Sequence, residues 1–293
     1  LTSGKELILN IGLQEQIMKE VVIKADVEKA DAQNEMTSVS ARTFSIDESM
    51  RYAGSLNDVA RMAQNFAGVQ GADDSRNDII VRGNSPLGVL WRVEGIDIPN
   101  PNHFAIAGTS GGPVSILNNK MMANSDFFTA AFPAEYGNST AGIFDLKFRN
   151  GNNEKHEFTG QFGFLGTEIM AEGPLNKKTG SSYLIAYRYS TLAIFGGLGI
   201  NVGTDAIPSY QDLSFKLNFP QKNGSSLSLF AISGMSDIDI VFSDEEKPSD
   251  DINIYGENDR DQYFNTAMGV VGLTYLKPMK KNAFSKTTLA GSV

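Results

Sequence analysis

The pattern that most restricts the fold is a strict alternation of polar and apolar side chains over residues 212–219. The apolar positions are Leu213, Phe215, Leu217 and Phe219, and the polar positions between them are Asp212, Ser214, Lys216 and Asn218. Successive side chains of a β-strand point to opposite faces, so this strand has one apolar and one polar face. Residues 158–164 and 183–189 alternate in the same way, although Leu184 interrupts the polar face of the second segment.

The connections between these strands alternate in length. Short basic turns are predicted at residues 176–180, 221–224 and 280–282, and longer loops at residues 196–208 and 243–262. Strands with one polar and one apolar face, short turns at one end and long loops at the other are typical of transmembrane β-barrels. The pattern predicts about seven strands, beginning with a tight hairpin at residues 164–167.

Composition excludes several other classes. The formal net charge of −9 makes nucleic acid an improbable partner. With no Cys and two His, the sequence predicts no disulfide, no zinc site, no metal and no cofactor. No segment approaches the roughly 20 apolar residues of a spanning helix, whereas a barrel strand needs only about ten.

A repeated motif occurs in residues 79–104. Two short apolar runs, residues 79–81 and 89–93, each end in a charged residue followed by glycine, namely Arg82-Gly83 and Glu94-Gly95. This arrangement resembles the plug domain of TonB-dependent outer-membrane receptors, in which a strand ending Ile/Val-Arg-Gly precedes one ending Asp/Glu-Gly. Residues 125–148 resemble the end of such a plug. Residues 1–7 resemble the end of the carboxypeptidase-regulatory-like domain that precedes some Bacteroidetes-type receptors.

The resemblance implies a mainly β protein in which a small α+β plug fills a transmembrane antiparallel β-barrel, partial in this chain. It divides the chain into the tail of an upstream β-sandwich (1–17), a TonB-box candidate with linker (18–43), the plug (44–150) and the first seven or so barrel strands (151–293). Plugged transporters of this kind close with roughly 22 strands. The chain is therefore expected to be a fragment of a longer receptor.

The implied function is TonB-dependent active transport across the outer membrane, without enzymatic activity. The implied partners are TonB with its inner-membrane energising complex, a small-molecule, glycan or peptide substrate, outer-membrane lipid and a surface lipoprotein. A short β-branched run beside a polar linker can add a strand to a partner's sheet. The TonB-box candidate is this run: Glu20, Val21, Val22, Ile23, Lys24 and Ala25. An ordinary edge strand of the plug is the alternative.

Two further predictions concern the plug. Arg82, Gly83, Glu94 and Gly95 form the plug motif, and a buried Arg82 requires a carboxylate partner, with Glu168 or Glu172 of the wall as candidates. The alternative is that groups within the plug turn supply the hydrogen-bond partners of Arg82. The rigid polar loop with Asn100, Asn102, His103 and Phe104 is a candidate substrate vestibule, which ordinary turn chemistry explains equally well.

Local patterns predict two short helices in the plug. The first covers residues 45–52, and Ser55 is expected to cap the second. The second helix is expected to bury a stripe at helical spacing, consisting of Leu56, Val59, Ala60, Ala63 and Phe66.

Other functional classes remain as alternatives. Residues 108–113 contain Ser110 in a Gly-x-Ser-x-Gly setting, but a serine nucleophile needs a histidine base, and only His103 and His156 exist. The acidic loop 243–262 has oxygen ligands for Ca²⁺ but fits an EF-hand poorly. A secreted β-rich adhesion module and a receptor-like subunit of an outer-membrane complex are the remaining alternatives.

Overall fold

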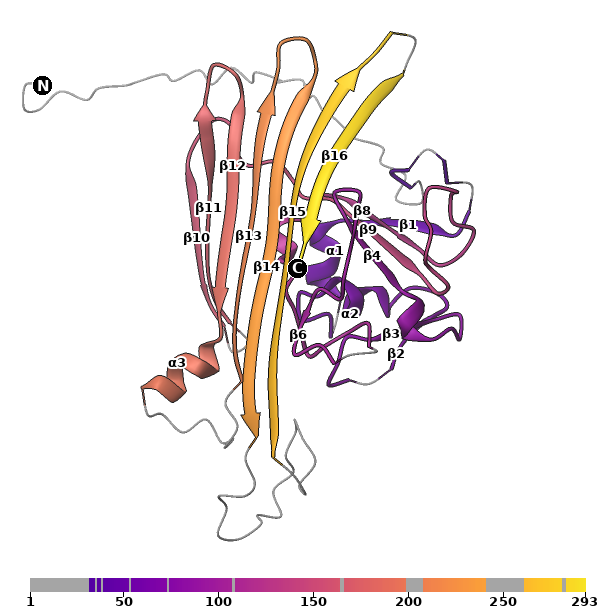
Figure 1. The fold of residues 1–293 in the computed structure, drawn as a ribbon, viewed down its shortest axis with the longest axis vertical. Coiled ribbons are helices and arrows are strands. Elements are labelled where there is room, and N and C mark those ends of the chain that lie inside the picture. The colour runs from indigo at the N-terminus through magenta and orange to yellow at the C-terminus, as the bar shows by residue number, and fades with distance from the viewer. Residues whose placement is uncertain are drawn as a thin grey trace, which may run out of the picture.

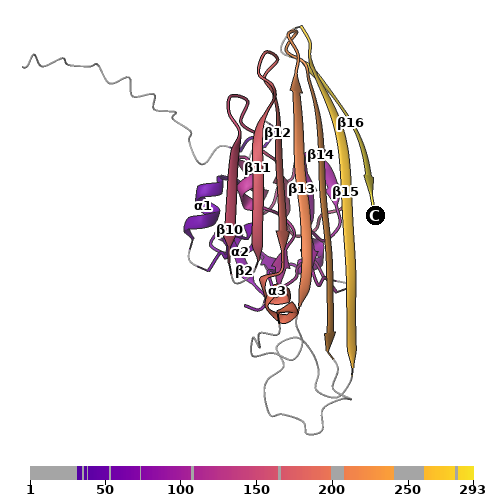
Figure 2. The same cartoon turned by 90° about the vertical axis from the view of Figure 1, so that its left-hand side faces the viewer.

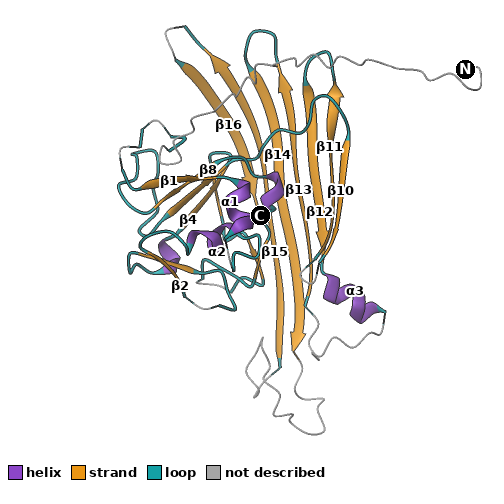
Figure 3. Ribbon diagram, turned by 180° about the vertical axis from the view of Figure 1, so that it is seen from behind, coloured by secondary structure: helices purple, strands orange, loops and turns teal. Residues whose placement is uncertain are grey.

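The protein consists of a small α+β unit packed against a tall curved sheet (Figure 1). The structure is a computed structural model and describes residues 32–34, 36, 37, 39–52, 54–72, 74–106, 109–163, 166–198, 208–240, 261–280 and 283–293. We call residues 41–150 the plug and the seven-stranded sheet that follows them the wall. Figures 2 and 3 show the plug on one face of the wall only.

A five-stranded sheet of order β1-β8-β9-β4-β5 forms the centre of the plug. Its strands are β1 (Ala41–Phe44), β4 (Leu90–Val93), β5 (Ile96–Ile98), β8 (Ser125–Phe128) and β9 (Ile143–Leu146). Strands β4 and β9 are parallel, and the other neighbouring pairs are antiparallel. The sheet begins at Ala41, before the predicted domain boundary at residue 44.

Small elements complete the plug. Two hairpins pair β2 (Val69–Gly71) with β3 (Ile79–Val81) and β6 (Asn102–His103) with β7 (Val114–Ser115). The helices are α1 (Ile46–Arg51), α2 (Val59–Ala63) and the 3-10 turns η1 (Pro86–Gly88) and η2 (Asn119–Met121).

The first predicted helix is confirmed, whereas the start of the second was misplaced. Ser45 caps α1 in a capping box with Glu48. Asp58, not Ser55, caps α2 through hydrogen bonds to two backbone amides. Leu56 therefore lies before the helix and is 60% exposed, while the other predicted stripe residues are buried.

The two charged-residue–glycine pairs form tight hairpin turns. The φ angles are 49° and 79° at Arg82 and Gly83, and 55° and 87° at Glu94 and Gly95. Positive φ at both central positions is the requirement of a type I′ turn, whose twist matches that of the flanking strands. Glu94-Gly95 joins β4 to β5, whereas Arg82-Gly83 follows β3 and closes the single bridge between Val81 and Asn84, so both charged residues lie at the tips of tight turns.

The wall is an antiparallel meander in which each strand pairs with the next along the chain. Its strands are β10 (Glu157–Phe162), β11 (Thr167–Asn176), β12 (Ser181–Tyr189), β13 (Ser209–Pro220), β14 (Ser226–Ile240), β15 (Gln262–Pro278) and β16 (Phe284–Ser292). The prediction of about seven strands is confirmed. Helix α3 (Thr191–Gly197) lies between β12 and β13. In the described ranges, no helix is long and apolar enough to cross a membrane.

The predicted two-faced strands are confirmed. The side chains that face the plug are buried and include Glu168, Glu172, Asp212, Ser214 and Lys216, whereas the exposed outward positions include Ile169, Tyr187, Leu213 and Val271. Leu184, which interrupted the polar pattern, has no exposed surface and belongs to the hydrophobic core. Its apolar character is explained by contact with the plug.

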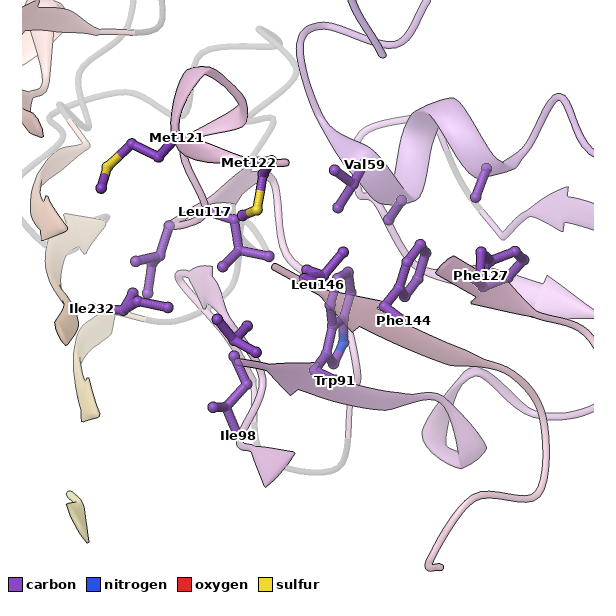
Figure 4. Close-up of a cluster of buried hydrophobic side chains, with 14 of the residues drawn as sticks. Val59, Trp91, Ile98, Leu117, Met121, Met122, Phe127, Phe144, Leu146 and Ile232 are labelled. Carbon is purple, nitrogen blue, oxygen red and sulfur yellow. The ribbon is translucent and has the colours of Figure 1, made fainter. Parts of the chain in front are cut away.

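The hydrophobic core is continuous between the plug and the wall. Figure 4 shows Ile232 of β14 reaching the same cluster as Leu117 and Leu146 of the plug. Glycines in the wall permit this close approach, because a Cβ at Gly234 would lie 2.5 Å from Ile116 and a Cβ at Gly272 would lie 2.6 Å from Ile96. Apolar burial is the main favourable term that holds the two units together.

Candidate functional site: the contact between plug and wall

Charged side chains of the plug meet oppositely charged side chains on the polar face of the wall. Within the described residues, three ion pairs and one histidine–carboxylate hydrogen bond cross this contact: Glu94–Lys216 at 2.9 Å, Lys120–Glu168 at 2.8 Å and Arg149–Glu172 at 2.7 Å, and His103–Asp212 at 3.0 Å. We call these the plug–wall pairs. Both partners in each pair are at most 29% exposed, so they fix how the plug sits on the wall.

The Glu94–Lys216 pair joins the tip of the β4–β5 hairpin to β13. One carboxylate oxygen of Glu94 accepts hydrogen bonds from Lys216 Nζ at 2.9 Å and from the Phe148 amide at 2.7 Å. Lys216 also donates to the Phe148 carbonyl at 2.7 Å. The Lys216 side chain is 9% exposed, so this is a buried and closed network, which makes its partners interdependent.

The pairs on β11 have strong geometry. Arg149 donates two parallel hydrogen bonds of 2.7 Å to the carboxylate of Glu172, which also accepts from the Asn152 amide. Glu168 accepts from Lys120 at 2.8 Å and from the Asn118 side chain at 2.9 Å. Bidentate contacts between guanidinium and carboxylate groups add geometric specificity as well as energy.

The predicted partner of Arg82 was wrong. Arg82 is exposed at its hairpin tip, and its guanidinium donates to the hydroxyls of Ser40 and Thr129 at 3.4 and 3.2 Å. Glu168 and Glu172, the predicted partners, instead bind Lys120 and Arg149. Arg82 therefore binds within the plug, whereas Glu94, at the equivalent position of its own turn, binds Lys216 of the wall.

His103 lies at the centre of a second buried network. The Asp212 carboxylate accepts from His103 Nε2 at 3.0 Å and from Arg188 Nε at 2.8 Å. Arg188 also donates to the Ser115 carbonyl, and the His103 ring packs 4.7 Å from the Tyr210 ring. The Nδ1 atom of His103 has no hydrogen-bond partner among the described residues. Among the described residues, the His103 ring is therefore held by a single hydrogen bond, which it makes with the wall.

The predicted vestibule loop is mostly buried in this contact. Asn102, His103 and Phe104 are 3%, 1% and 9% exposed. The Phe104 amide donates to the Ser236 hydroxyl of β14 at 3.0 Å, while Asn102 accepts from Asn77 at 2.6 Å. Asn102 binds within the plug and only Asn100 is half-buried, whereas His103 and Phe104 hold the loop to the wall. Their wall partners lie more than 100 positions downstream, so local sequence gave no sign of them.

A cavity of about 540 Å³ opens between the plug and the first wall hairpin. Its lining combines apolar residues with charged ones; among them are Met50, Leu56, Asp58, Arg61, Lys120, Glu168 and Arg188. Such a mixed lining suits a small polar ligand. None of the four predicted vestibule residues lines it.

Other candidate chemistry is not assembled in the described part of the chain. The Ser110 hydroxyl lies 3.4 Å from the Asp78 carboxylate, and the Ser110 carbonyl accepts from the Trp91 indole at 3.2 Å. His103 is occupied by Asp212, so no serine–histidine pair forms among these residues. No group of metal-ligating side chains occurs among them either. The TonB-box candidate and most of loop 243–262 lie outside the described residues.

The ionisation of His103 makes the plug–wall contact sensitive to pH. Burial lowers the pKa of His103 below its ordinary value of 6.5, and the hydrogen bond and charge of Asp212 offset this shift only in part. The unfolded state therefore binds a proton more readily, so stability is complete above pH 6.5 and falls as pH drops below it. We expect His103→Gln, which retains an N–H donor toward Asp212, to flatten this dependence.

The measurement is denaturant unfolding of the plug at several pH values across this window. His156→Gln serves as the control, because His156 is the only other histidine and is exposed. An equally steep loss of stability in His103→Gln and the unaltered protein would remove His103 as the cause.

A plug fixed by ion pairs to the polar face of an antiparallel wall defines the plug-and-barrel class of fold. No protein-family model and no curated protein matches the sequence. Solved structures do match. The siderophore receptor PirA from Acinetobacter baumannii has a TM-score of 0.57 and 16% identity, and the match covers 87% of this chain and 40% of that one.

Two further solved structures match comparably. FpvA from Pseudomonas aeruginosa, solved with heterologous pyoverdines and iron, has a TM-score of 0.58 and 14% identity, with 86% of this chain and 33% of that chain covered. The outer-membrane transporter YddB from Escherichia coli has a TM-score of 0.57 and 12% identity, and the match covers 86% of this chain and 38% of that chain. This chain thus spans between 33% and 40% of the length of these three proteins. It has the fold of TonB-dependent outer-membrane receptors, and the predicted fold class is confirmed.

Proposed function

We propose that this chain is part of a TonB-dependent transporter of the outer membrane, in which the plug closes the barrel at rest. The observation that carries the proposal is the set of plug–wall pairs, buried between the plug and the polar inner face of the wall. These pairs and the continuous hydrophobic core together hold the plug against the wall. Residues 44–150 act as the gate, and residues 151–293 supply the first strands of the barrel.

The gate is moved by force applied at Glu20–Ala25, which adds as a strand to TonB. Contacts just downstream support this route. The Asp126 carboxylate accepts hydrogen bonds from the amides of Gln33 and Asn34 at 2.9 and 3.0 Å, and from the Thr43 hydroxyl at 2.5 Å. The chain then enters the plug as β1, the edge strand of the central sheet. The Asn34 side chain also donates to Glu135 at 2.6 Å and to Tyr136 at 3.1 Å, so a pull from upstream acts on these contacts and on Asp126 before it acts on β1.

The substrate is a small molecule, and a ferric chelate is the first class to test. PirA is described as a siderophore receptor, and FpvA was solved with an iron-bound pyoverdine. The cavity between plug and first hairpin has charged and apolar walls of a kind that such a chelate can contact. Glycans and peptides are the other classes, and a surface lipoprotein is a further candidate partner.

The experiment measures binding of the periplasmic domain of TonB to the full-length protein in detergent. Ile23→Pro removes a backbone donor that strand addition requires, so binding is expected to be lost. Ala30→Pro, which lies outside the candidate box, is the matched control and should bind as the unaltered protein does. Equal binding by Ile23→Pro and the unaltered protein would refute the box, and absence of binding in all three would refute TonB coupling.

A further inference from the structure

Helix α3 is an apolar helix with no charged residue. It covers Thr191–Gly197, with Ser190 as its cap and Leu198 directly after it, in the sequence Thr-Leu-Ala-Ile-Phe-Gly-Gly-Leu. Leu198 is 69% exposed, and residues 192–196 are only half-buried. A surface helix of a water-exposed connection normally carries polar residues on its outer face. The composition of α3 therefore requires a partner that is itself apolar.

The position of α3 identifies which surface of the protein it extends. The views in Figures 1, 2 and 3 agree that α3 lies on the side of the wall away from the plug. The Phe195 ring meets the Phe162 ring edge-on at 6.0 Å. Phe162 is the last residue of β10 and is 67% exposed. The helix thus continues the outward face of the wall and does not belong to the contact with the plug.

An apolar row runs across the outward face near this helix. Ile169 pairs with Tyr187, which in turn pairs with Leu213 on the next strand. All three are at least 36% exposed. In a barrel embedded in a membrane, outward apolar side chains contact lipid, and aromatic residues gather at the interface. The row and α3 lie on the same outward face of the wall, with the aromatic ring of Tyr189 between them, which indicates one common occupant.

We propose that α3 lies in the lipid interface at the end of the wall that carries the long connections, with Phe195 and Leu198 inserted among the acyl chains. The proposal rests on the proposed function, because it needs the wall to be embedded in a membrane. Its consequence is that α3, which follows β12 almost directly, is held at the membrane and outside the mouth of the barrel. Short apolar helices bind such interfaces through the apolar area that they bury.

The test uses tryptophan quenching by brominated lipids in vesicles of the full-length protein. The native Trp91 is 4% exposed in the plug core, so the emission difference between variant and unaltered protein reports the new position. Phe195→Trp is the test variant. Leu213→Trp on the outward face is the positive control, and Leu87→Trp, which is 60% exposed on the plug, is the negative control.

We expect brominated phosphatidylcholine to quench Phe195→Trp as strongly as Leu213→Trp and to leave Leu87→Trp unchanged. Quenching of Leu213→Trp without that of Phe195→Trp would overturn the inference while leaving the membrane position of the wall intact. Absence of quenching at both positions would overturn the proposed function itself. If Phe195→Trp does not fold, Leu198→Trp replaces it. Shielding of the new tryptophan from both bromine and aqueous iodide would identify a protein partner and also overturn the inference.

Discussion

Replacing Lys216 by methionine is expected to weaken the attachment of the plug to the wall by about 3–5 kcal/mol, the usual cost of breaking one half of a buried ion pair. Methionine retains most of the aliphatic stem but not the ammonium group. The Glu94 carboxylate and the Phe148 carbonyl would each lose the donor that now lies 2.9 and 2.7 Å away. An uncompensated buried charge is the main reason for the large effect.

The measurement is the denaturant midpoint at which the plug becomes accessible to protease in the full-length protein. Lys155→Met is the matched control, because Lys155 also pairs with a glutamate at 2.7 Å but is 71% exposed. That variant should leave the midpoint unchanged. The double variant Glu94→Gln/Lys216→Met should recover part of the loss, since it removes the unpaired charge. Equal midpoints for Lys216→Met and Lys155→Met would show that the pair does not hold the plug.

Replacing Phe144 by alanine is expected to destabilise the plug by about 3–5 kcal/mol, as is typical of a fully buried phenylalanine. Phe144 has no exposed surface and lies on β9, inside the central sheet. Its ring centroid is 4.4 Å from both the Trp91 and the Phe127 rings. The alanine variant loses both contacts and leaves a cavity that the neighbouring strands cannot fill.

Trp91 provides a local readout of this variant. Its indole stacks on Phe144 with an interplanar angle of 11°, so tryptophan fluorescence follows unfolding at this position. We expect the unfolding midpoint to fall in Phe144→Ala and to stay constant in Phe158→Ala. Phe158 is 77% exposed on the outward face of the wall. A plug midpoint equal to that of the unaltered protein would contradict the core described here.

The two faces of the wall could be predicted because strand periodicity is a local property. Leu213 and Asp212 are neighbours in sequence, and the pleat alone sends them to opposite faces. The charged-residue–glycine motif was recognised only through its resemblance to plug domains, and the structure adds its local reason, because positive φ at two successive positions favours a Gly in the second. The sequence also showed that Leu184 interrupts the polar face of its strand. The reason for this apolar residue, its contact with the plug core, became clear only from the structure.

The plug–wall pairs could not be predicted residue by residue. Lys216 and Glu94 are separated by 122 positions, and His103 and Asp212 by 109. The sequence shows many charges, and nothing local distinguishes the Arg82 tip, which is exposed, from the Glu94 tip, which is docked. The predicted start of α2 was wrong for a different reason. Ser55 and Asp58 are both good caps, and the tertiary hydrogen bond from Asn77 favours Asp58.

The most direct test of the whole account is the behaviour of the full-length protein in isolated outer membranes. A closed barrel resists detergent until it is boiled, so an unboiled sample should migrate faster on a denaturing gel than a boiled one. We predict this faster band, in the outer-membrane fraction. A protein found outside that fraction, with one band whether boiled or not, would contradict the account, because the polar face of the wall would then enclose no barrel.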